Sequence, residues 1–209
     1  MAVLSSATQW TVYIRIPRRW IWVDLDLGAY EQQAALAAAI EDLVTKVPAL
    51  ERHAQGLRAS LIATVANALD DCAMFLTVGY ALADTDVAVM TATGYGLAGD
   101  DERTDLATLA LSLRTRPERV IEGHWNLQTV GFPTGDALRV HAISQDGEPD
   151  DEGRVTYLEG IDHYFPIPGS TDMLLLSCTT PSVALGDLLA DCFDQIAASV
   201  EIHPGPPVR

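Results

Sequence analysis

Basic residues, cysteines and long apolar runs are all scarce in this sequence of 209 residues. Thirteen Lys and Arg stand against 29 Asp and Glu, so the formal net charge is −16. Nucleic acids and anionic membrane surfaces repel a protein of this charge, which argues against both as partners and favours basic ones. No apolar run reaches the roughly 20 residues of a membrane-spanning helix, and the first ten residues lack a signal-peptide pattern. We therefore expect a cytoplasmic protein.

The three cysteines are Cys72, Cys178 and Cys192, and no two of them form a C-x-x-C pair. An odd, widely spaced set indicates reduced thiols that pack as small core residues, not a disulfide framework. A contact between Cys178 and Cys192 stays open at this stage. Burial of Cys178 in an apolar strand is expected to raise the pKa of its thiol, which argues against a nucleophilic role. The sequence also lacks a phosphate-binding P-loop and a G-x-S-x-G motif.

Apolar residues make up 48% of the chain, which is enough for a sizeable core and argues against wholesale disorder. Alternation of apolar and polar residues predicts strands, and an apolar repeat of three to four residues predicts helices. The first two strands are expected at 10–16 and 20–27, followed by a helical hairpin over 28–70. Later strands are expected at 73–82, 87–93, 119–129, 137–144, 154–165 and 173–179, with helices at 104–113 and after Pro181.

Most of these strands are joined by hairpins, so we predict an α+β fold with a largely antiparallel sheet flanked by helices. The helical hairpin is inserted after the second strand. A single domain is expected to cover 1–203, with a flexible tail at 204–209. The turn in "PIPGSTD" is expected to place Gly169 at a positive φ, which a side chain would strain.

A glycine-rich stretch, "GYGLAG", contains Gly94, Gly96 and Gly99 in the G-x-G-x-x-G spacing of dinucleotide-binding loops. Such a loop needs a parallel strand before it and a helix that begins within the glycines. Here the preceding strand is the return arm of a predicted hairpin. The helix is expected to begin after Gly99, with the acids at 100–102 at its N-terminus. Their carboxylates already satisfy the helix dipole and would repel a phosphate. We interpret the stretch as an acid-capped loop and expect no cofactor.

His124 and His141 are predicted to lie on the polar face of one hairpin, with Glu122 nearby. Two imidazoles and a carboxylate are half of a metal site. His163 is two residues from Ile161, so in a strand it shares the apolar face of Ile161 and not the polar face of His124 and His141. A third ligand is therefore missing, and no metal is expected. We interpret the pair as solvated or interface histidines.

The last helix is predicted to bury an apolar stripe and to expose an acidic one. The buried stripe is expected at Leu185, Leu188, Cys192, Ile196 and Val200. The opposite face carries Asp187, Asp191 and Asp194 at helical spacing, so their carboxylates are expected in solvent. Such a face is usually only solvated, but it also fits a basic partner.

The segment 155–202 resembles the C-terminal half of small uncharacterised actinobacterial proteins, in which a proline-rich turn leads into an apolar strand and a final helix. The matching residues are Tyr164, Pro166, Pro168, Gly169, Thr180, Pro181, Phe193, Asp194, Ile196 and Ala197, with Pro133, Gly135, Ala137, Arg139 and Val140 in the middle of the chain and Pro17 and Trp20 near its start. The resemblance implies a PsbP/LpqN-like α+β fold and, because some such proteins are encoded near type VII (ESX-type) secretion genes, a secretion context. It transfers no catalytic residue. This chain departs from the pattern in its "GYGLAG" stretch and in the acid-rich insert near Asp150.

These observations favour a non-catalytic cytoplasmic protein-binding factor. More specifically, we hypothesise an accessory or chaperone-like role in a secretion system. Two alternatives stay open. One is an immunity-type protein that masks a basic toxin, and the other is an enzyme that uses the glycine stretch at 94–99 or the face of His124 and His141. The predicted partner-binding residues are Asp187, Asp191, Asp194, Glu122, His124 and His141.

Overall fold

The computed structural model describes residues 2–5, 10–18, 20–83, 86–99, 105–115, 117, 119–147 and 152–204. Glu122 and Asp187 have described backbones, but their side chains lie outside the described part. The predicted α+β class and largely antiparallel sheet are confirmed, because every strand pair among the described residues is antiparallel.

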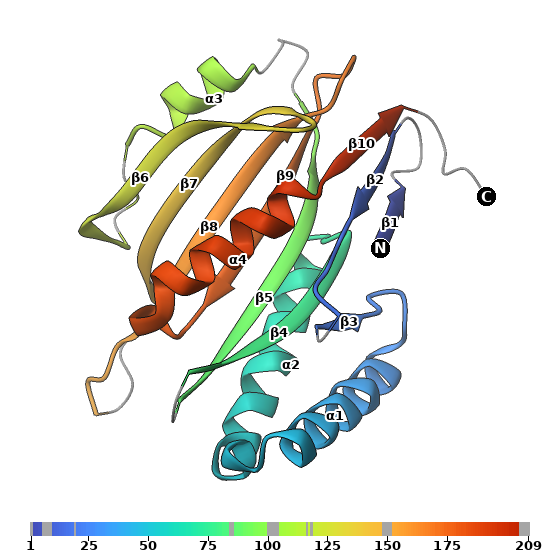
Figure 1. Cartoon of the computed structure of the whole chain (residues 1–209), viewed down its shortest axis with the longest axis vertical. Helices are drawn as coiled ribbons and strands as arrows, with labels where there is room; N and C mark the ends of the chain where they lie inside the picture. Colours follow the sequence, from blue (N-terminus) through green and yellow to red (C-terminus); the bar gives the residue numbers. More distant parts are fainter. Residues whose placement is uncertain are drawn as a thin grey trace.

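Seven strands form the main sheet, in the order β3-β4-β5-β9-β8-β7-β6 (Figure 1). Their bounds are β3 Ile21–Val23, β4 Phe75–Ala83, β5 Asp86–Leu97, β6 Val120–Phe132, β7 Gly135–Asp146, β8 Thr156–Pro166 and β9 Met173–Thr180. The hairpins expected from the alternating pattern pair as β4 with β5, β6 with β7, and β8 with β9. Gly169, between β8 and β9, has a φ of 77°, as its turn requires.

A second sheet has three strands, with β2 (Trp10–Ile14) between β1 (Ala2–Ser5) and β10 (Glu201–Pro204). Only β2 was predicted. The two outer strands have four residues each, which is too short for a period-two pattern to stand out. The expected tail at 204–209 is corrected at its start, since Pro204 belongs to β10 and pairs with Trp10. Residues 205–209 lie outside the described part.

Helices α1 (Ala29–Lys46) and α2 (Ala54–Asp70) are joined by the 3-10 turn η1 (Pro48–His53). Helix α1 begins where the Glu31 carboxylate accepts a hydrogen bond from the Gly28 N–H, and Pro48 follows its end. The helical repeat predicts a buried stripe on α1, and four of its members are buried while Val44 is partly buried; the stripe is Leu36, Ile40, Leu43, Val44 and Val47. The stripe predicted for the next helix ends at Leu69, but Leu69 is 41% exposed and its neighbour Ala68 is buried.

The main sheet has two differently covered faces. Helix α4 (Gly186–Ala198) contacts β8 and β9, and we call its side the α4 face. Helices α1 and α2 contact β3 and β4 on the opposite side, the α1–α2 face. The alternation of β4 divides its residues accordingly, with Phe75 in the core under α4 and Leu76 in the core under α1 and α2. In Figure 1 α4 lies in front of the sheet and α2 behind it.

The buried stripe of α4 differs from the predicted one. The buried residues are Leu189, Phe193, Ile196, Ala197 and Val200, whereas Leu188 is 59% exposed. Leu185 belongs to a separate 3-10 turn, η2 (Val183–Leu185), and α4 begins only at Gly186. The predicted stripe assumed that Leu185 belongs to the same helix as Leu188. Because Leu185 lies in η2 instead, the predicted stripe is offset from the one that is buried.

Candidate functional site

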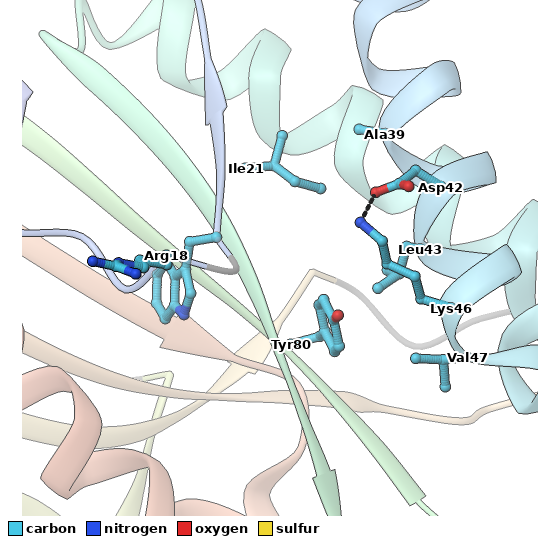
Figure 2. A pocket seen from close by; sticks show the side chains of 9 residues that line it. Arg18, Ile21, Ala39, Asp42, Leu43, Lys46, Val47 and Tyr80 are labelled. Carbon is cyan, nitrogen blue, oxygen red and sulfur yellow. Dashed lines mark hydrogen bonds and ion pairs between the residues drawn. The ribbon is translucent and has the colours of Figure 1, made fainter.

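An open cleft lies between α1 and the edge of the main sheet, and its volume is about 550 Å³. Figure 2 shows Tyr80 of β4 on one side and residues of the second half of α1 on the other. Its lining residues are Arg18, Trp20, Ile21, Ala39, Asp42, Leu43, Lys46, Val47 and Tyr80. Most of these side chains are apolar or aromatic, which is typical of a surface that binds another molecule's apolar groups.

The cleft exists because β3 is much shorter than its neighbour β4. Strand β3 pairs only with Leu76–Val78, and before Ile21 the chain turns away, with the Trp20 N–H donating to the carbonyl of Pro17. The Trp20 indole then lies against β4 at Gly79, where a Cβ would overlap the ring. Glycine at this position thus allows the aromatic wall of the cleft to form.

The charged groups of the cleft are Arg18, Lys46 and Asp42. Lys46 and Asp42 form an i, i+4 ion pair on α1, drawn as a dashed line in Figure 2. The hydrogen bond with Asp42 raises the pKa of Lys46 above its usual value. Arg18 is exposed and forms no ion pair with another described residue. Among the described residues that line the cleft, two cations stand against one carboxylate, and that carboxylate is already paired.

His124 and His141, predicted to share one face of a hairpin, line one hollow of about 470 Å³ on the α4 face. The structure adds Glu159, which the sequence analysis did not single out. Its carboxylate is 4% exposed and forms a 2.6 Å hydrogen bond with His141 Nε2. The register of β7 and β8 could have indicated this contact, because Glu159 is opposite Ile143, which is two residues from His141 and on the same face. The side chain of Glu122 lies outside the described part.

The Glu159 carboxylate also lies against the first residue of α4. A Cβ at Gly186 would overlap the carboxylate, so glycine is required for this approach. A negative charge at this end of a helix is stabilised by the helix dipole. Glu159 therefore connects His141 to the start of α4.

The other side chains that line this hollow are mostly apolar. No serine, threonine or cysteine is among the described residues that line it. Among the residues that the structure describes, no group of three or more His, Cys, Asp or Glu could hold a metal ion. All three cysteines are free thiols, and burial raises the pKa of Cys178 well above its usual value, as predicted.

Asp194 differs most from its predicted role. Its Oδ1 accepts hydrogen bonds from Arg139 Nε and from His163 Nε2, both at 2.9 Å. The alternation of β7 predicts an outward-facing Arg139, and His163 was predicted on the opposite face from His141. Instead, Arg139 and His163 are opposite each other in the β7–β8 ladder, on the same face as His141 and under α4. They are 8% and 0% exposed. Asp194 is thus a half-buried contact between α4 and the sheet, whereas Asp191 is exposed as predicted.

The glycine-rich stretch is mostly strand. Gly94 and Gly96 belong to β5, which is antiparallel to both β4 and β9, and a Cβ at Gly94 would overlap Phe75. Helix α3 (Leu106–Ser112) begins later than expected, and its cap is Asp105, whose carboxylate accepts from the Thr108 N–H. The predicted acid cap at 100–102 lies outside the described residues. These glycines allow close packing, and the helix does not begin within them.

Comparison with models of known protein families found no match, and comparison with curated proteins found none either. Within the described residues, no helix combines the length and the apolar character needed to cross a membrane.

Proposed function

We propose that this protein is a non-catalytic protein-binding factor and that the cleft beside β4 is its binding site. The observation that carries the proposal is the combination of an apolar, aromatic-lined cleft with a strand edge that β3 leaves open. Exposed apolar surface next to an open edge is a common basis of protein–protein recognition.

The finer form of the proposal is an accessory or chaperone-like factor of a secretion system that acts in the cytoplasm. Its basis is the resemblance to PsbP/LpqN-like proteins, some of which are encoded near type VII secretion genes. In this proposal α1 and α2 form a helical hairpin inserted after the second predicted strand. The hollow at His124 and His141, together with Asp191, is a second surface for the same partner, since the sequence pattern predicted a partner there.

The cleft is tested with a pair of neighbouring substitutions on α1. Ala39→Arg places a long side chain in the cleft, whereas Ala38→Arg places it on the exposed side of the same helix turn. Both replace alanine by another good helix former, so both variants are expected to fold. A partner captured from the native organism, then purified, should lose at least tenfold in affinity for Ala39→Arg and less than twofold for Ala38→Arg.

Equal binding of the partner to both variants would show that the cleft is not its site. The same assay with His141→Ala and Asp191→Asn would then locate the contact on the α4 side. Detection of substrate turnover that depends on His141 and Glu159 would overturn the non-catalytic proposal as a whole.

A further inference from the structure

We propose that the partner binds the cleft as an extended segment that adds to β4 as a new edge strand, with an apolar side chain in the cleft and an acidic residue near Arg18. This inference rests on the proposed function and specifies how the partner is bound.

The open edge of β4 is defined by its pairing on the two sides. On one side all nine residues, Phe75–Ala83, pair with β5. On the other side only Leu76–Val78 pair with β3, so 79–83 have no strand beside them among the described residues. Alternate N–H and C=O groups of an edge strand point outward and can pair with another chain. At about 3.3 Å per residue, this edge accepts an extended segment of roughly five residues.

The position of the cleft next to this edge determines what the added segment would carry. Tyr80, which lines the cleft, lies on β4 within the open stretch. Side chains of a strand alternate between the faces of the sheet, so every second residue of an added strand would point towards α1. There Leu43 and Val47, 5% and 7% exposed, form the apolar wall. A segment that fits therefore has an apolar residue at every second position, and the residues between them point to the opposite face of the sheet.

Charge complementarity selects the rest of the segment. The chain as a whole has a net charge of −16, yet the cleft has Arg18 and Lys46 against Asp42 alone. Since Lys46 is already paired with Asp42, Arg18 is the group left to meet a carboxylate. An acidic side chain in the segment would pair with it, whereas a basic segment would meet no free carboxylate of the cleft.

A library test identifies such a segment without knowledge of the natural partner. Random ten-residue peptides displayed on phage are selected on the purified chain, with Ala39→Arg as the counter-selection. We expect enriched peptides with alternating apolar residues and at least one acid. The best peptide, synthesised with capped ends, should slow hydrogen exchange of the amides at 79–83. N-methylation of its alternate backbone nitrogens on the pairing edge should weaken binding at least tenfold.

The charge is tested by Arg18→Glu, with Arg114→Glu as the matched control, because Arg114 is also exposed and lies on the segment after α3, away from the cleft. Arg18→Glu should weaken the acidic peptide at least fivefold and favour a version with lysine in place of the acid. Arg114→Glu should change its affinity less than twofold. An unchanged affinity for Arg18→Glu would overturn the acidic requirement.

Three outcomes separate this inference from the function on which it rests. Peptides that are sensitive to Ala39→Arg but give no protection at 79–83, or bind equally when N-methylated, overturn strand addition and leave the cleft as a binding site. Failure to enrich any peptide overturns the peptide as occupant, and failure of the natural partner to distinguish Ala39→Arg from Ala38→Arg overturns the cleft itself. Concentration-dependent dimers with protection at 79–83 would identify a second copy of this chain as the occupant instead.

Discussion

Two neighbouring residues of β8, the half-buried Asp162 and the buried His163, differ in how the two faces of the sheet surround a polar group. His163 lies on the α4 face, is fully buried, and shares the Asp194 carboxylate with Arg139. Asp162 lies on the α1–α2 face opposite Ser177 of β9 and forms no ion pair with another described residue. Opposite charges are thus paired at Asp194, whereas Asp162 has no ion pair among the described residues.

The two carboxylates respond to burial in opposite directions. Burial alone would raise the pKa of Asp194, but hydrogen bonds from His163 and Arg139 and the charge of Arg139 hold that pKa below its usual value. For Asp162, burial raises the pKa, and the hydrogen bond with Ser177 and the charge of His163 oppose it only in part. Desolvating a charge is costly unless the charge is paired. The ion pairs of Asp194 are therefore expected to stabilise the fold, whereas the charge of Asp162 is expected to destabilise it.

The largest expected effect tests the core of the α4 face. Phe193 is 1% exposed and packs into the continuous core between α4 and the sheet. Phe193→Ala should lower the free energy of unfolding by about 3–5 kcal/mol, because it removes a large buried ring and leaves a cavity. Leu188→Ala, on the same helix but 59% exposed, should change it by less than about 0.5 kcal/mol. Denaturant titrations measure both, and a large loss for Leu188→Ala would restore the stripe predicted from sequence.

The next effect tests the ion pairs of the same face. Asp194→Asn should cost about 1–3 kcal/mol at neutral pH, less than a fully buried pair, because the Asp194 side chain is 40% exposed. Since the folded pKa is lowered, the stabilisation is present above the unfolded pKa, about 3.9, and is lost as the pH falls through the folded value. The difference between wild type and variant should therefore shrink below about pH 4.

Asp191→Asn is the matched control for this change, because Asp191 is exposed one turn earlier on α4. Its unfolding free energy should stay within about 0.5 kcal/mol of wild type at all pH values. Equal, small losses for the two variants would return Asp194 to the solvated acidic face that its spacing predicted.

The fold class and most of the main sheet could be predicted from the sequence, because alternation over eight or more residues is a strong local signal. The strands β1 and β10 could not, since four residues hold too little pattern, and β10 is also distant in sequence from its partner β2. The helix that carries Asp194 was predicted, but its rotation was not. The stripe was predicted to pass through Leu188 and Cys192, whereas Leu189 and Phe193 are buried. One residue along a helix is a rotation of about 100°, which is enough to exchange a solvated residue for a contact.

The candidate sites depended even more on distant contacts. His124 and His141 were paired correctly from their spacing around one turn, and they line the same hollow. Glu159 and Arg139 were missed, because a charged residue in an alternating strand is assumed to face solvent, whereas both of these residues are buried on the α4 face. The cleft beside β4 arises because β3 begins only at Ile21, opposite Val78, and no residue of β4 itself indicates this.

The smallest expected effect is a gain in stability at Asp162. Asn has nearly the same shape as Asp and can keep a hydrogen bond with Ser177, but it carries no charge to desolvate, so Asp162→Asn should stabilise the protein by about 1 kcal/mol at neutral pH. The sign follows from the raised pKa. The protonated folded form is favoured, so wild-type stability falls as the pH rises from the unfolded-state pKa of about 3.9 towards the folded-state pKa. The advantage of the variant should appear over that pH range.

Asp146→Asn, at an exposed position at the end of β7, is the control and should show no such trend. Unfolding titrations from pH 4 to pH 8 measure the difference. A loss of stability for Asp162→Asn at neutral pH would mean that the carboxylate has a favourable partner, and the contrast between the two faces would then be wrong.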